Sequence, residues 1–155
     1  GLSIVALDGR DGTTVAGAFI NRDFLTPPDP RIAEFVAEPS PFAPIVGALD
    51  IIDEAWFAAH PEIDRHKTGR VVDLWMVGVH PNYRGRRIAS KLSTRSLEQV
   101  ARAGFDYAIV ECTGAFSQHA MQAAGCKAVH ELPYADFRWH GKAIFKMCPL
   151  PTPSG

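Results

Sequence analysis

The chain has 155 residues, of which 46% are hydrophobic, and its formal net charge at pH 7 is −1. This length predicts one domain that buries about two thirds of the surface of its unfolded chain. The near-neutral charge argues against a nucleic-acid partner. No apolar run reaches the ~20 residues that a membrane-spanning helix needs, so we expect no membrane partner. Because the three cysteines, Cys112, Cys126 and Cys148, are odd in number and lie in apolar segments, we expect reduced thiols in a cytoplasmic protein.

The first half of the chain combines a hairpin, a loop and a helix. Two apolar, β-rich segments, Leu2–Asp8 and Thr13–Asp23, flank a Gly-containing turn, which predicts a β-hairpin. Six prolines between Thr26 and Pro44 predict a long loop. Apolar residues at helical spacing then predict a helix over residues 43–60.

The segment Val71–Val79 is rich in β-branched and aromatic residues and nearly free of charge, which predicts a buried strand. Pro81 ends this strand because proline has no N–H to donate to a ladder. From Ile88 to Gly104 apolar residues recur at steps of three and four, which predicts an amphipathic helix. Strand and helix flank a basic turn around Gly85, an arrangement that aims free N–H groups and a helix dipole at a phosphate.

Basic residues concentrate on this turn and helix. Six of the sixteen Lys and Arg residues lie there, and Glu98 is the only acid among them: Arg84, Arg86, Arg87, Lys91, Arg95 and Arg102. Cations at a helix N-terminus are unfavourable against the dipole unless an anion binds there. We therefore predict a phosphorylated cofactor as the ligand of the turn, with a solvated helix face as the alternative.

The remaining elements are short. The pattern predicts a strand over residues 106–112, a helix over 117–124 and two final strands over 127–137 and 143–148. The domain should therefore span residues 1–148, followed by a loose, Pro-rich tail over 149–155. This order of elements predicts an α/β fold, a three-layer sandwich with a mixed central β-sheet and helices on both faces. The strand–helix–strand unit over 71–112 should be parallel.

The turn carries a motif that resembles a known family. Val79–Ala89 is similar to motif A of the GNAT superfamily of N-acetyltransferases, written (Gln/Arg)-x-x-Gly-x-(Gly/Ala). Arg84 occupies the first position and Ala89 the last, whereas Arg87 replaces the glycine. The resemblance implies acetyl-CoA as the cofactor, with the coenzyme A pyrophosphate cradled by the turn. The implied binding residues of the turn are Arg84, Gly85, Arg86, Arg87, Ile88 and Ala89.

Two later segments resemble the insect-type arylalkylamine N-acetyltransferases. These are the cysteine–serine stretch Cys112–Met121 and the segment Tyr134–Lys146, which holds an Ala-Asp-Phe element and a Gly-x-x-Ile-Phe-Lys end. The likeness implies an acetyl-CoA-dependent acyltransferase that moves the acetyl group directly to a small arylalkylamine-like primary amine. Members usually open with a strand and one or two helices before the first hairpin, whereas this sequence begins within that hairpin. We expect a missing N-terminal segment, because Leu2–Asp8 would otherwise form an uncovered hydrophobic edge; a reduced variant of the fold is the alternative.

Acetyl transfer to an amine needs a held thioester, a donor to its carbonyl oxygen and an acceptor for the ammonium proton. By resemblance, the central strand separates from the next strand, and its freed backbone binds the pantetheine arm. The implied residues of this strand are Met76, Val77, Gly78 and Val79.

The sequence leaves alternatives open for the proton acceptor. The glutamate that insect-type enzymes are thought to use lies in a helical region that this chain does not contain. Asp73 is the best local carboxylate, because a regular strand places it on one face with Trp75 and Val77. Glu111, at the end of the neighbouring strand, is the alternative, and an ordinary charged residue at a strand end is the other interpretation of Asp73.

A proton donor near the departing thiolate would help the reaction. Met121 occupies the place where many members of the superfamily use a tyrosine, so Ser117 is the candidate donor. A helix cap is the alternative role of Ser117, and His119 is a second candidate donor. By resemblance, Thr113 and Ser117 match the partner hydroxyls of the insect-type enzymes.

Aromatic residues are expected to line an acceptor pocket that favours an apolar amine over a polyamine. They are Phe42, Trp56, Phe57, Tyr134, Phe137 and Trp139. We expect a small-molecule amine as the partner and no metal, because no Cys-x-x-Cys or His-x₃-His spacing occurs; a homodimer is left open. Two other hypotheses are a non-catalytic, regulatory CoA-binding module and an enzyme that acetylates a protein or peptide amine.

Overall fold

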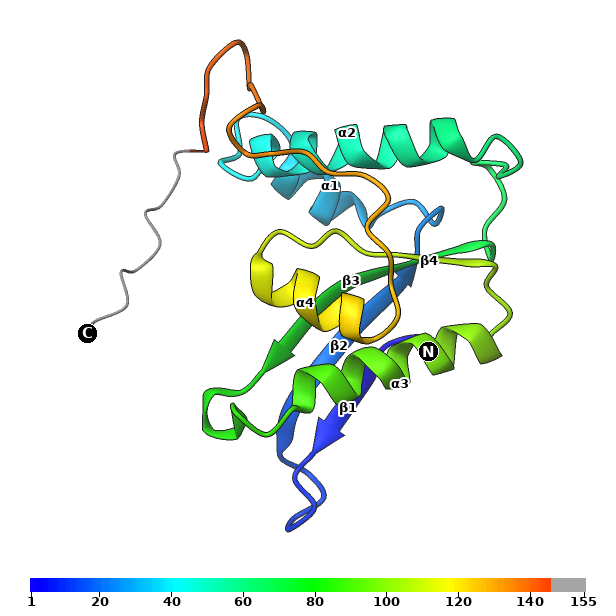
Figure 1. Cartoon of the computed structure of the whole chain (residues 1–155), viewed down its shortest axis with the longest axis vertical. Coiled ribbons are helices and arrows are strands. Elements are labelled where there is room, and N and C mark those ends of the chain that lie inside the picture. Colours follow the sequence, from blue (N-terminus) through cyan, green and yellow to red (C-terminus); the bar gives the residue numbers. More distant parts are fainter. Residues whose placement is uncertain (146–155) are drawn as a thin grey trace, which may run out of the picture. The chain divides into compact units, whose positions relative to one another are not determined.

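The computed structural model describes residues 1–145, which form two compact units (Figure 1). The first unit comprises residues 1–27 and 62–128, and the second comprises residues 28–61 together with the chain from 129 onward. The first unit holds the whole sheet and the basic turn, so it carries most of the predicted site.

A four-stranded sheet forms the centre of the first unit, in the order β1 (Ile4–Leu7), β2 (Val15–Asp23), β3 (Val71–Val79) and β4 (Tyr107–Ile109). The pairs β1–β2 and β2–β3 are antiparallel, whereas β3 and β4 are parallel. The predicted hairpin, the predicted parallel unit and the mixed sheet of an α/β fold are confirmed. The strand predicted over 106–112 is shorter, because its pairing ends at Ile109.

Two helices complete this unit, α3 (Ile88–Arg102) and α4 (Ala115–Ala123). α3 packs on β1, β2 and β3 and also contacts α4 (Figure 1). The buried core cluster consists of Phe19, Val72, Leu74, Leu92, Val100 and Met121. No helix within residues 1–145 combines the length and the apolar composition needed to cross a bilayer.

The second unit contains α1 (Pro30–Val36) and α2 (Ala43–Ala59). The predicted helix over 43–60 is confirmed, but the loop predicted over 26–44 is wrong because α1 lies inside it. The Asp29 carboxylate accepts a hydrogen bond from the Arg31 N–H at 2.9 Å and caps the helix. Pro30 is tolerated because the first helical N–H has no partner within the helix.

The two final strands are wrong for the residues that the structure describes. Residues 129–145 form a turn after Pro133 and one antiparallel bridge, between Trp139 and Lys142. Alternating apolar residues predict a strand only where a neighbouring strand supplies ladder hydrogen bonds, and Pro133 cannot donate one. Residues 146–148 of the last predicted strand, Cys148 and the tail over 149–155 lie outside the described residues.

At Gly17, β2 lies close to both β3 and α3. A Cβ added there would lie 2.9 Å from the Gly78 carbonyl oxygen and 3.1 Å from Cγ2 of Ile88. We expect Gly17→Ala to lower the free energy of unfolding by about 1–3 kcal/mol, because strand and helix must move apart. Denaturant unfolding measures this loss.

Gly78→Ala is the matched control, since its added Cβ would meet no atom of the described residues within 4 Å. Its free energy of unfolding should stay within about 0.5 kcal/mol of the wild-type value. Equal stability of the two variants would contradict the close packing at Gly17.

Candidate functional site

A β-bulge in β3 organises the candidate site. On β2 two residue steps separate Ile20 from Arg22, whereas their partners Met76 and Asp73 are three steps apart on β3. β3 therefore contains one extra residue between Asp73 and Met76, and the direction of its backbone groups changes there. Side chains before and after the bulge also exchange faces of the sheet.

Backbone hydrogen bonds on both sides of the bulge show this change. The Val71 carbonyl accepts a hydrogen bond from the Phe24 N–H at 2.9 Å, so before the bulge the backbone N–H and C=O groups of odd-numbered residues point toward β2. The His80 N–H donates to the Ala16 carbonyl at 2.9 Å, so after the bulge the backbone groups of even-numbered residues point toward β2. The N–H and C=O groups of Val77 and Val79 consequently point to the opposite side of the strand.

On that side β3 has a neighbour only at its start. β4 pairs with β3 at Val71, Val72 and Asp73, and among the described residues no strand continues this pairing beyond Asp73. Backbone groups of Val77 and Val79 are thus left open where the two strands separate. The strand separation expected at Met76–Val79 is therefore present in the structure.

A cavity of about 210 Å³ occupies the space between the separating strands. The strand residues Trp75, Met76 and Val77 line one side, and residues after β4 and on α4 line another. α3 contributes Ala89 and Ser93. Val79 and Gly78 lie just beyond the lining residues of this cavity along β3.

Two of the three predicted catalytic residues meet in this cavity. Thr113 and Ser117 both line it, as does Glu111. The Ser117 hydroxyl donates to the Gly114 carbonyl at 2.8 Å and accepts from the Gly114 N–H at 3.3 Å, so it also occupies a helix-capping position. His119, the second candidate donor, is exposed and does not line the cavity.

Asp73, the third predicted catalytic residue, lies outside the cavity lining and has an exposed fraction of 1%. Its Oδ2 accepts a hydrogen bond from Nε of Arg22 at 2.7 Å, whereas its Oδ1 is buried without a hydrogen-bond partner. Burial, and then the nearby Glu111 carboxylate, raise the pKa of Asp73 to about 6, against the lowering effect of Arg22. Asp73 is therefore not an ordinary charged residue at a strand end.

The bulge corrects the predicted face of Val77. Asp73 lies opposite Arg22, whereas Val77 lies opposite Phe19, and these two partners are three residues apart on β2. Phe19 belongs to the core under α3. Val77 thus lies on the α3 face of the sheet and Asp73 on the other face, because the extra residue reverses the alternation.

The basic turn supplies a helix N-terminus without a side-chain cap. A short 3₁₀ helix, Pro81–Tyr83, leads through Arg84 and Gly85 to α3. No side chain caps the first turn of α3, and this turn contains no acid. Its free N–H groups and the positive end of the helix dipole therefore suit an anion.

The backbone conformation of Arg87 explains why the motif has glycine at this position. Its φ is 58° and its ψ 26°, in the left-handed region that non-glycine residues rarely adopt. The side chain is exposed. The arginine is therefore tolerated because its side chain is exposed to solvent, but its backbone conformation is strained.

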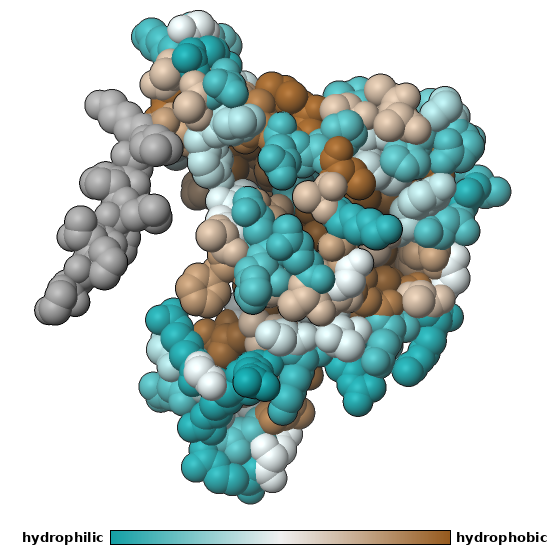
Figure 2. All heavy atoms as spheres, in the orientation of Figure 1, coloured by the Kyte–Doolittle hydropathy of each residue, from teal (hydrophilic) through white to brown (hydrophobic). Residues whose placement is uncertain are grey.

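Tyr83 anchors the turn to the β1–β2 hairpin. Its hydroxyl donates to Oδ2 of Asp8 at 2.6 Å, and the Arg10 guanidinium also pairs with this carboxylate. Hydrogen bonds from Arg10 and Tyr83 hold the pKa of Asp8 well below its usual range. The guanidinium of Arg86 lies 5.2 Å from the Tyr83 ring centroid. The lower end of Figure 2, where the hairpin loop and the turn lie, is largely hydrophilic.

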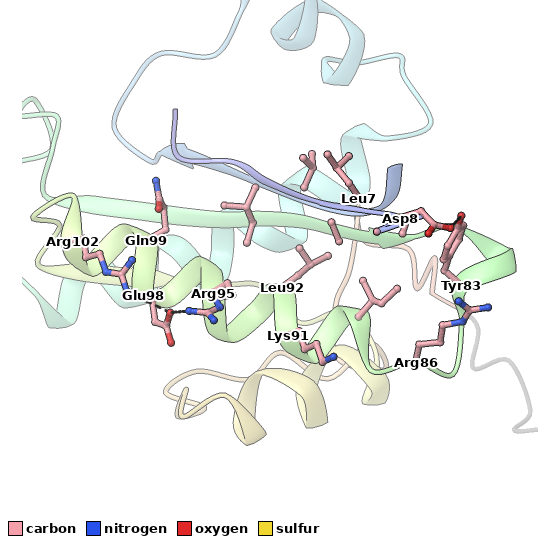
Figure 3. A pocket seen from close by; sticks show the side chains of 16 residues that line it. Leu7, Asp8, Tyr83, Arg86, Lys91, Leu92, Arg95, Glu98, Gln99 and Arg102 are labelled. Carbon is pink, nitrogen blue, oxygen red and sulfur yellow. Dashed lines mark hydrogen bonds and ion pairs between the residues drawn. The ribbon is translucent and has the colours of Figure 1, made fainter. Parts of the chain in front are cut away.

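A larger cavity of about 600 Å³ lies between β1 and α3 (Figure 3). Arg86, Lys91, Arg95 and Arg102 contribute basic side chains to its lining. Of the predicted cofactor residues only Arg86 and Ile88 line it, and none of the predicted catalytic residues does. Thr113 and Ser117, two of the predicted catalytic residues, thus line the smaller cavity and not this one.

All six aromatic residues predicted for the acceptor pocket fall in the second unit. Trp56, Phe57 and Phe137 are buried. Phe42 packs on Phe35 with ring centroids 4.9 Å apart, and Tyr134 packs equally closely on Phe145. Within their own unit most of these rings therefore act in packing, which is the usual role of aromatics at helical spacing.

A sequence profile identifies the family of the chain, and solved structures show a similar fold. The sequence profile described as the acetyltransferase (GNAT) family matches residues 19–126. The fold is similar to arylalkylamine N-acetyltransferase 2 from Aedes aegypti, with a TM-score of 0.63 and 22% identity over 96% of this chain and 68% of that chain. It is also similar to the C-terminal condensation domain of Ebony, solved with beta-alanyl-dopamine, with a TM-score of 0.70 and 14% identity over 88% of this chain and 61% of that chain.

The strain at Arg87 generates a stability prediction. We expect Arg87→Gly to raise the free energy of unfolding by up to about 1 kcal/mol, because glycine adopts the left-handed region without a steric penalty. Arg87→Ala removes the same charge but keeps the Cβ, so it should not be stabilised. Denaturant unfolding compares the three proteins, and equal effects of Gly and Ala would contradict the strain.

The burial of Asp73 generates a pH prediction. The folded state holds the carboxyl proton up to a pKa of about 6, whereas the unfolded chain loses it near the model-compound value of 3.8. Stability contributed by this residue is therefore present at low pH and lost as the pH rises from about 4 to 6.

Asp73→Asn should escape that loss. The free energy of unfolding of the wild type, relative to this variant, should fall by on the order of 3 kcal/mol across the interval. Denaturant unfolding at a series of pH values measures it, and a difference independent of pH would contradict the raised pKa.

Proposed function

Because the chain belongs to the acetyltransferase (GNAT) family, we propose that it is an N-acetyltransferase that moves the acetyl group of acetyl-CoA to a small, arylalkylamine-like primary amine. One observation carries the proposal: β3 separates from β4 beside a cavity that contains Glu111, Thr113 and Ser117. This arrangement supports a site in which open backbone groups hold the thioester and nearby side chains move protons.

The basic turn fits the pyrophosphate of coenzyme A. Uncapped N–H groups at the start of α3 and the absence of acid in its first turn favour a bound anion. Arg84 and Arg87 are both exposed beside these groups. Their charge-assisted hydrogen bonds to phosphate would contribute roughly 1.5–3 kcal/mol each.

The open backbone of β3 fits the pantetheine arm. Val77 and Val79 offer N–H and C=O groups on the side that β4 leaves free. At Gly78 an added Cβ would meet no described atom within 4 Å, so this glycine leaves open space instead of filling a packing contact. When bound, acetyl-CoA supplies the activated acetyl group as a thioester.

Backbone N–H groups fixed in this way can polarise the thioester carbonyl. They belong to a strand whose other side is hydrogen-bonded to β2, so they need little reorganisation when charge develops on the oxygen. A donor of this kind contributes about 3–4 kcal/mol to transition-state stabilisation in enzymes where it has been removed.

A carboxylate pair can take the proton that the ammonium must lose before attack. Glu111 lines the cavity, and its carboxylate raises the pKa of the buried Asp73, so the two acids lie near each other. Glu111 is the better placed acceptor because the amine can reach it. We assign Asp73 to the same ionising pair, which would titrate as a unit.

Ser117 and Thr113 line the cavity in which the thiolate is expected, so their hydroxyls are candidate proton donors. The Ser117 hydroxyl now donates to the Gly114 carbonyl, and a rotation about its Cα–Cβ bond would redirect the proton to the departing sulfur. Capping and proton donation are therefore compatible roles for this residue.

The names of the matched proteins support the acceptor class. One is an arylalkylamine N-acetyltransferase, and the other is a condensation domain solved with beta-alanyl-dopamine. Both names refer to compounds that carry an aromatic ring on an amine or amide side chain. A phenylethylamine-like compound is therefore the first acceptor to test.

The phosphate assignment predicts the effect of a charge reversal. Arg84→Glu should weaken coenzyme A binding by about tenfold or more, because a like charge then faces the pyrophosphate. The remaining affinity should depend less on salt. Calorimetry measures both, with Arg70→Glu as a control on the same unit but outside the turn; an unchanged affinity for Arg84→Glu would remove the assignment.

Turnover tests the reaction itself. Acetyl-CoA and a panel of amines, including phenylethylamines, a polyamine and a peptide with a free N-terminus, should release coenzyme A most rapidly with the arylalkylamines. Ser117→Ala and Glu111→Gln should each lower kcat by about 10²-fold or more while acetyl-CoA affinity stays nearly unchanged. Release of no coenzyme A with any amine would instead favour the non-catalytic CoA-binding module.

A further inference from the structure

Arg22 on β2 was not singled out by the sequence, yet it is the one cation that contacts the buried Asp73 among the interactions the structure gives. Its Nε donates to Oδ2 of Asp73 at 2.7 Å. The arginine side chain keeps an exposed fraction of 40%, whereas that of Asp73 is 1%. The ion pair therefore joins a partly exposed guanidinium to a buried carboxylate.

Trp75 fixes the position of this guanidinium. The Cζ atom of Arg22 lies 5.5 Å from the ring centroid of Trp75, within the range of a cation–π contact. Trp75 belongs to the bulged part of β3 and lines the cavity. Trp75, which contacts Arg22, therefore lies next to the edge of β3 where the acetyl group is expected.

The geometry leaves one carboxylate oxygen of Asp73 without a hydrogen-bond partner. A single Nε–H contact satisfies Oδ2 but not Oδ1, so the charged form is only partly compensated. Glu111 follows β4 by two residues, and Asp73 pairs with Ile109, the last residue of β4. The two acids therefore flank the point at which the strands separate.

The other charged groups near this point have partners elsewhere. On β2, Asp23 accepts hydrogen bonds from the N–H groups of Leu25 and Gly69. Before β4, Asp106 pairs with Arg70. Arg22 and Glu111 are thus the charged groups that act on the ionisation of Asp73: Glu111 raises its pKa and Arg22 lowers it.

We propose that Arg22 is a positioning residue that orients Asp73, sets the ionisation of the Asp73–Glu111 pair and thereby sets the pH range of acetyl transfer. The proposal rests on the proposed function, in which this pair accepts the proton of the amine. Arg22 touches neither of the expected substrates; it acts through the carboxylate that it holds.

The test measures ionisation and catalysis separately. Carboxyl ¹³C NMR titration of the full chain, without substrates, follows Asp73 and Glu111 in the wild type and in Arg22→Gln. Removal of the cation should raise the pKa of the pair by about one unit or more. The acidic limb of the kcat/KM profile, measured with acetyl-CoA and phenylethylamine, should move to higher pH by the same amount.

Two further variants separate charge from packing. Arg22→Lys keeps the positive charge and should displace both readouts much less than Arg22→Gln. Arg70→Gln removes the arginine of another Arg–Asp pair in the same unit and should displace neither. If Arg22→Gln does not fold, the Lys variant still tests the proposal, because loss of the oriented Nε–H should move both readouts in the same direction.

An unchanged carboxyl pKa in Arg22→Gln would overturn the proposal. A carboxyl pKa that moves while the acidic limb stays in place would overturn the link between Arg22 and catalysis, although coenzyme A release would still support acetyl transfer. Absence of coenzyme A release in the wild type would instead overturn the proposed function, and the NMR titration would still report the effect of Arg22 on Asp73.

Discussion

The separation of β3 from β4 after Asp73 is the constraint on which the rest of the site depends. A strand inside a sheet normally uses its backbone groups on both sides, so an open side has to be created. Here the bulge reverses the backbone of β3 just where its pairing with β4 stops. The residues adjacent to Val77 and Val79 in β3 are hydrogen-bonded to β2 and fix the strand, whereas the N–H and C=O groups of Val77 and Val79 point to the side that β4 leaves open.

The same bulge distributes the charged groups. It leaves Asp73 on the sheet face that carries Arg22, and it places Val77 over the α3 face with the core residue Phe19. A buried carboxylate in such a place costs stability at neutral pH, because folding must remove it from water. Active sites commonly accept this cost, since a carboxyl group with a pKa near 6 can exchange protons under physiological conditions.

The sequence predicted the elements whose signal is local. The strand over 71–79, the basic turn, α2 and α3 followed from periodicity and from proline and glycine positions, and the motif around Arg84 indicated the family, which the profile match confirms. The prediction that this strand is buried is correct only for Val71–Leu74, since β3 has no β4 neighbour after Asp73 and its next residues are exposed. The final strands failed because strand formation depends on a partner, which alternation does not reveal. α1 was missed because a proline-rich composition hid a capped helix start at Asp29.

The candidate site shows the same division. Ser117 and Thr113 were identified by resemblance and do meet in the cavity, but their roles stay predictions. The bulge, which reassigns Val77 to the other face, and Arg22, which lies 51 positions from its partner Asp73, had no sequence signal. An arginine one residue before Asp23, at the end of β2, resembles an ordinary strand terminus until the register of the sheet is known.

Amide hydrogen exchange with and without coenzyme A tests whether the open backbone at Val77 and Val79 receives the coenzyme. We expect the Met76 and Gly78 amides to be protected in both states. The Val77 and Val79 amides should exchange rapidly in the free protein and become protected when coenzyme A binds. Val77 and Val79 amides that are already protected in the free protein, or that coenzyme A leaves unprotected, would contradict this expectation.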